Sequence, residues 1–90
     1  NQYKGSDNMK IKSIDLKKVY SQYVTYHKFN VTVDDNNIIK IEFCSRISAK
    51  ERVLSEVKVL YKNNKEKTYS ALNVPKKYEQ LFEMFLKNYK

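Results

Sequence analysis

His27 and Cys44 are the only histidine and the only cysteine among the 90 residues, and they are the side chains best suited to nucleophilic chemistry. An imidazole can take the proton of a neighbouring thiol and leave a reactive thiolate. If the chain turns back on itself at 34–37, position 27 comes to lie near Cys44 on the paired strand. An activated cysteine also needs an electropositive pocket and oxyanion donors, and no glycine-rich loop supplies those donors. We therefore expect a protein that is not an enzyme.

The same two residues are too few to build a metal centre. One histidine and one cysteine cannot complete a zinc site. The Asp/Asn cluster at 34–37 lacks the longer glycine-containing frame and the distal glutamate of a calcium loop. The sequence also contains no phosphate-binding loop and no dinucleotide-binding fingerprint. We expect neither a metal nor a cofactor.

Aromatic rings and positive charges are interleaved between positions 17 and 28. Exposed tyrosines and arginines are typical of protein interfaces. Rings beside lysines on a sheet also suit single-stranded nucleic acid, because the rings stack on bases while the charges follow the backbone. The opposing interpretation is that tyrosines fill the core, since the chain has only four Phe and no Trp. The candidate binding residues are Lys17, Lys18, Tyr20, Tyr23, Tyr26, His27 and Lys28, together with Arg46 and Arg52.

The formal net charge of +8 is compatible with an acidic protein, nucleic acid or an anionic membrane surface as partner. It is also what a Lys-, Asn-, Ile- and Tyr-rich composition typical of AT-rich genomes would give without any functional meaning. Of the 18 basic residues 16 are lysines, whereas nucleic-acid readers usually enrich arginine for bidentate contacts. We therefore predict a non-catalytic protein-protein interaction module, with a small basic nucleic-acid-binding protein of a phage or mobile element as the alternative.

Two runs of alternating apolar and polar residues, at 29–33 and 39–43, flank the Asp/Asn turn and predict a β-hairpin with one buried face. Val24 and Tyr26 are out of phase with Phe29, which predicts a β-bulge that turns both sets inward. A second hairpin is predicted over 57–61 and 67–72, around a polar, Asn-rich turn. The capping-box pattern at 48–51 adds one helical turn over 48–53.

Positions 14–22 fit two structures. Leu16, Val19, Tyr20, Tyr23 and Val24 follow helical spacing, yet the segment is rich in strand-forming residues. The C-terminus is a clearer helix that starts at Pro75. Its apolar stripe, from which Met84 is absent, consists of Tyr78, Leu81, Phe82, Phe85, Leu86 and Tyr89.

These elements predict an α+β fold, an antiparallel sheet of four or five strands with the C-terminal helix packed on one face. The segment 48–60 also has apolar residues at helical spacing. If both 14–22 and 48–60 are helical, the alternative is a ferredoxin-like split β-α-β with an added helix. We interpret 1–8 as a flexible polar lead and 9–90 as a single small domain. An unpaired sheet edge offers a route to a homodimer.

No apolar run approaches the length of a transmembrane helix, and no signal peptide is visible. The sequence begins with Asn rather than Met. If the polar lead remains after removal of a signal or anchor segment, the domain is the soluble part of a secreted or surface-anchored bacterial protein. If the native start is Met9, we expect a cytoplasmic protein.

Overall fold

The computed structural model describes residues 10–20, 22–48 and 50–88, so the flexible lead predicted for 1–8 lies outside the described residues. Five strands come first, and a short 3₁₀ helix and one α-helix follow them. Their bounds are β1 (Lys10–Tyr20), β2 (Thr25–Asp34), β3 (Ile38–Ser48), β4 (Glu51–Tyr61), β5 (Glu66–Ser70), η2 (Ala71–Asn73) and α1 (Lys76–Asn88).

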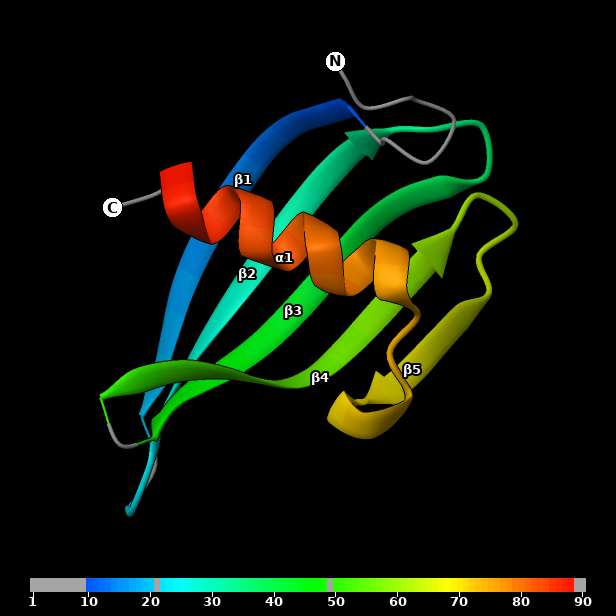
Figure 1. The fold of residues 1–90 in the computed structure, drawn as a ribbon. Helices are drawn as coiled ribbons and strands as arrows, with labels where there is room; N and C mark the ends of the chain where they lie inside the picture. Colours follow the sequence, from blue (N-terminus) through cyan, green and yellow to red (C-terminus); the bar gives the residue numbers. More distant parts are fainter. Residues whose placement is uncertain (1–9, 21, 49, 89–90) are drawn as a thin grey trace.

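The five strands form one antiparallel sheet in the order β1-β2-β3-β4-β5, and α1 crosses one face of it (Figure 1). This confirms the predicted α+β architecture. The ferredoxin-like alternative does not occur, because 14–20 are extended and pair with β2, and 51–60 are extended and pair with β3. The α1 helix is too short and too polar to cross a bilayer, and no other helix in the described residues could do so.

The predicted hairpin around the Asp/Asn turn is β2 and β3. Phe29 lies opposite Phe43, and Val31 lies opposite Ile41, so the apolar residues of both strands share one face. In the turn, the Asp35 carboxylate accepts hydrogen bonds from the backbone N–H groups of Asn37 (2.9 Å) and Ile38 (3.2 Å). An Asp side chain thus closes the turn without glycine.

The second predicted hairpin is β4 and β5. Asn64 adopts a left-handed backbone with φ 69°, which asparagine tolerates better than most residues. The side-chain oxygen of Asn63 accepts a hydrogen bond from the Lys65 N–H (3.0 Å). The backbone N–H of Lys62 also donates to the Asn37 carbonyl (2.9 Å), which joins the two turns at this end of the sheet.

Two local predictions are wrong. The helical turn at 48–53 is instead the tight β3–β4 turn, where Lys50 takes φ 69°, followed by the start of β4. The bulge predicted for β2 is absent, because Tyr26 pairs in regular register with Arg46 and lies on the face opposite Phe29. Register shifts occur in other pairings. One lies between Ile11 and 13 in the β1–β2 pair, and two lie in the β3–β4 pair, at 38–40 and at 44–45.

The core lies between α1 and the sheet. Phe82 of α1 stacks on Phe43, with ring centroids 5.4 Å apart, and meets Phe29 edge-on at 6.3 Å. Such a short helix is marginal alone, so this packing is what holds it. The predicted stripe is confirmed for the buried Tyr78, Leu81 and Phe82 and for the partly buried Leu86, and Met84 is exposed as expected. The side chains of 85 and 89 lie outside the described set.

Candidate functional site

The sheet divides the predicted binding residues between its two faces. Side chains alternate along a strand, and the register places Lys17 opposite Lys28 and Tyr26 opposite Arg46 on the face without a helix. We call this the open face. The pair Lys18 and His27 lies on the helix-bearing face, and so does Arg52, which contacts core residues there. Tyr20 is the last residue of β1, opposite Thr25 of β2, and Tyr23 lies in the connection between these strands.

His27 and Cys44 do not come together. Lys28 is opposite Cys44, and His27 is opposite Ser45, so the two candidate side chains point to opposite faces. The predicted register was off by one residue, which is enough to move every side chain to the other face. Burial raises the pKa of the Cys44 thiol, and the nearby Glu56 and Glu42 raise it further against the opposing effect of Lys28. This environment is the reverse of the one that activates a cysteine.

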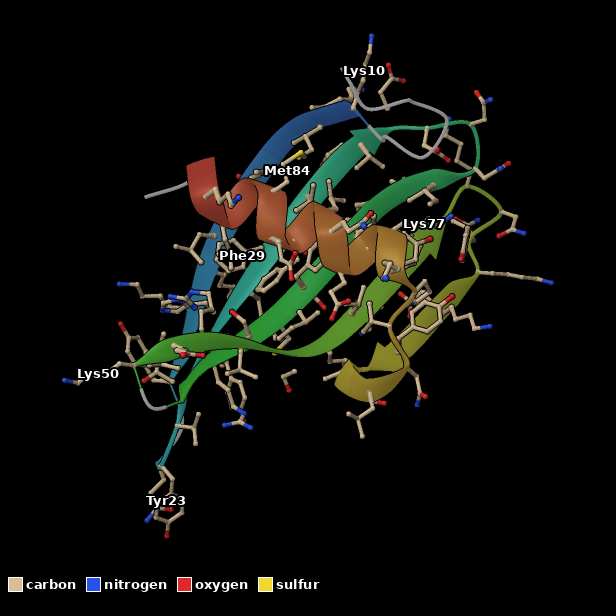
Figure 2. The ribbon with its side chains drawn as sticks, viewed as in Figure 1. Lys10, Tyr23, Phe29, Lys50, Lys77 and Met84 are labelled. Atoms are coloured by element: carbon tan, nitrogen blue, oxygen red, sulfur yellow. The ribbon has the colours of Figure 1, made fainter. Side chains whose placement is uncertain are left out.

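The two hairpin tips that lie beside each other form a basic end of the domain, which we define as residues 17–28 and 44–54. This end has six basic residues and one acidic residue, and it therefore carries +5 of the formal net charge of +8. Figure 2 shows Tyr23 and Lys50 at this end of the sheet and Lys10 at the other. The basic residues are Lys17, Lys18, Lys28, Arg46, Lys50 and Arg52.

Large apolar and aromatic side chains are exposed at the same end. Tyr20 is 72% exposed, Tyr23 is 85% exposed and Ile47 is 51% exposed. The interpretation of tyrosines as core residues is correct for Tyr78 but not for the two at the hairpin tip. Exposed aromatic residues and arginines are enriched in protein interfaces.

On the helix-bearing face, Ser45 organises the basic end. Its side chain is fully buried, with an exposed fraction of 0%, and its hydroxyl has two hydrogen-bond partners. The hydroxyl donates to the His27 carbonyl (3.4 Å) and accepts from Arg52 Nη1 (3.2 Å). The Arg52 guanidinium also lies 5.8 Å from the centroid of the Phe29 ring. Sequence reasoning missed Ser45, and the available signal was its inward position in β3, two residues after Phe43.

Positive charge and burial set the electrostatics of His27 and Arg52. Burial lowers the pKa of His27, and the positive charges of Arg52 and Lys18 lower it further. Burial also lowers the pKa of the Arg52 guanidinium, and no carboxylate among the described residues offsets that effect. The Nδ1 atom of His27 is buried, and no described protein group hydrogen-bonds to it.

Away from the basic end, the charges of the open face are balanced. Glu42 lies opposite Lys58, and Lys40 lies in the same cross-strand row as Leu60 and Glu66. These residues line a shallow hollow. Opposite charges across neighbouring strands stabilise a sheet and suit a solvated surface. The open face therefore offers no continuous positive track away from the basic end.

Comparisons with known proteins give no family for this chain: no protein-family model, no curated protein and no solved structure matches it.

Proposed function

We propose that this domain is a non-catalytic protein-binding module whose basic end binds an acidic region of a partner protein. The observation that carries the proposal is the pair of exposed rings, Tyr20 and Tyr23, at the tip of a hairpin within a cluster of six cations. Tyrosines supply large contact areas with few rotatable bonds, and they are over-represented among the residues that dominate binding energy.

The surrounding charges fit the same role. Lysines at the rim of an interface accelerate the encounter with an acidic partner and orient it, although each contributes little to final affinity. The exposed Ile47 adds apolar area at the neighbouring hairpin tip. An aromatic centre with a cationic rim favours a partner segment that combines acidic and apolar residues.

Selection of peptides from a displayed library tests the proposal. We expect the selected peptides to carry net negative charge and to bind the Tyr20→Ala/Tyr23→Ala variant at least about tenfold more weakly. The matched control is Leu72→Ala, because Leu72 is a 96% exposed apolar side chain in η2, beside β4 and β5 rather than the hairpin tip. Selected peptides that are neutral, or that bind the double variant as tightly as the parent, would overturn the proposal.

A second candidate function is single-stranded nucleic-acid binding, and one arrangement favours it. Tyr26 lies opposite Arg46 and close in register to the Lys17–Lys28 pair, so a ring on the open face is bordered by cations. A base could stack on the ring while phosphates meet the charges. This function predicts binding of an oligonucleotide that weakens steeply with salt and is reduced in Tyr26→Ala. Absence of binding at about 50 mM salt, where such contacts are strong, would remove it.

A further inference from the structure

We infer that Arg52, Ser45 and His27 form a carboxylate-binding site on the helix-bearing face of the basic end. The inference rests on the proposed function, since the ligand it assigns is an aspartate or glutamate side chain of the acidic partner. The site would bind one acidic side chain of the partner at a defined position on the basic end. The two hairpin tips extend beyond α1, so the helix does not cover this part of the face (Figure 1).

Contacts with Ser45 and Phe29 hold the Arg52 guanidinium in place. A buried serine hydroxyl is costly unless it is hydrogen-bonded, and Ser45 meets that need with the Arg52 guanidinium and the His27 carbonyl. The Phe29 ring supports the guanidinium from the core side. An arginine positioned in this way loses less conformational freedom on binding than a free surface arginine.

The Arg52 guanidinium has N–H donors that Ser45 does not use. A guanidinium carries five N–H groups in a planar fork, and Ser45 accepts from one nitrogen. Two parallel N–H groups match the two oxygens of a carboxylate and form a bidentate, charge-assisted pair with it. Since no carboxylate of the described residues offsets the desolvation of Arg52, this fork is the group in the cluster that most needs an anion.

The neighbours of the guanidinium add positive charge and apolar surface. His27 has a buried Nδ1 without a hydrogen-bond partner among the described groups, and Lys18 lies opposite it on β1. Ile47 lies opposite Arg52 on β3 and is half exposed. Lys18 and Arg52 therefore both place positive charge near His27, and an apolar side chain lies beside Arg52. That combination fits an acidic side chain within a peptide, whose flanking atoms can pack on Ile47.

Acetate is the simplest probe of the site, used at constant ionic strength with sodium chloride as the reference salt. We expect acetate to shift the backbone amide resonances of Ser45 and Arg52 and the ring resonances of His27 in nuclear magnetic resonance spectra. In Arg52→Lys the charge remains but the fork is lost, and we expect binding to weaken about tenfold. The matched control is Arg46→Lys, because Arg46 is the other arginine and lies on the open face.

A second variant tests the site without changing Arg52 itself. Ser45→Ala removes the hydroxyl that positions the guanidinium, and we expect it to weaken acetate binding as well while Arg52 is still present. An equal effect of the Arg46 and Arg52 variants, or shifts that chloride reproduces, would overturn the site. Much tighter binding of inorganic phosphate than of acetate would also overturn it, since it would indicate a phosphate ligand.

The outcomes separate this inference from the proposed function. If the double tyrosine variant loses peptide binding while Arg52→Lys binds acetate like the parent, the carboxylate site is wrong and the protein-binding function stands. If acetate binds through Arg52 but no acidic peptide is selected, the anion site stands and the proposed function is wrong.

Discussion

The ring of Phe82 in α1 stacks on the ring of Phe43 in β3, with centroids 5.4 Å apart and ring planes inclined by 25°. This contact joins the last element of the chain to the middle strand of the sheet. Phe43 is fully buried, and Phe82 also meets the edge of Phe29 on β2. The attachment of α1, and with it one side of the core, therefore depends on a small group of aromatic rings.

Phe82→Ala should destabilise the domain strongly. Replacing a buried phenylalanine with alanine removes apolar burial and leaves a cavity, and it typically costs about 3–5 kcal/mol. For a small domain this is a large part of the whole free energy of unfolding. Urea denaturation followed by circular dichroism measures the loss. The control is Met84→Ala on the exposed side of α1, where we expect a loss below about 1 kcal/mol. Similar losses in both variants would contradict the packing described.

Tyr78 should make stability sensitive to alkaline pH. Burial raises the pKa of its hydroxyl, and Tyr61, which hydrogen-bonds to it, adds to the shift, followed by Tyr69 and Asp35. Because the pKa is higher in the folded state than in the unfolded chain, this stabilisation is complete below about pH 10, the unfolded value, and is lost as pH rises above it. We expect Tyr78→Phe to reduce the loss of stability above pH 10 in urea melts.

The exposed Tyr23 provides the matched control for that experiment. Tyr23→Phe removes one hydroxyl from a ring that is already in solvent, so its alkaline stability profile should follow that of the parent. If Tyr78→Phe and Tyr23→Phe have the same profile, the hydroxyl of Tyr78 is not protected by the core in solution.

His27 should lower stability at acidic pH. Its pKa is depressed by burial and by the neighbouring charges of Arg52 and Lys18, so the folded state disfavours the imidazolium. The unfolded chain then binds more protons, and stability falls as pH decreases through about 6.5 toward the folded pKa. His27 is the only histidine, so proton resonances of its ring report the titration without overlap. His27→Gln should show a flatter stability profile below pH 6.5, and a ring that titrates at or above 6.5 would contradict the prediction.

The hairpin of β2 and β3 could be predicted because each strand buries one face and exposes the other, so its sequence alternates. The β1 strand could not be assigned in this way. It is an outer strand whose partly buried Leu16 and Val19 are spaced by three residues, which suits a helix as well as a strand with side chains on both faces. Pairing with β2 decides between them, and pairing is not a local property.

The candidate site was harder to predict than the fold for a related reason. The tyrosines and cations at 17–28 are neighbours along the sequence, but alternation sends Lys17 and Lys18 to opposite faces. Ser45 is neither apolar nor charged, so its side chain does not stand out in the sequence. Its role depends on the β2–β3 register, which the sequence analysis predicted one residue away from the observed pairing. The basic end appears only when the β1–β2 and β3–β4 tips are placed side by side.

Cys44 should react slowly with thiol reagents. Burial raises the pKa of its thiol, with Glu56 and Glu42 adding to the effect, so less thiolate is present near neutral pH than in a free cysteine. Alkylation by iodoacetamide at pH 7.5 should therefore be slower than that of glutathione. Lys28 lies opposite Cys44 and acts to lower the pKa, so Lys28→Gln should slow alkylation further. Lys58→Gln, a lysine on the same face opposite Glu42, should leave the rate unchanged. A rate faster than that of glutathione would show an activated thiol and would favour a nucleophilic role for Cys44.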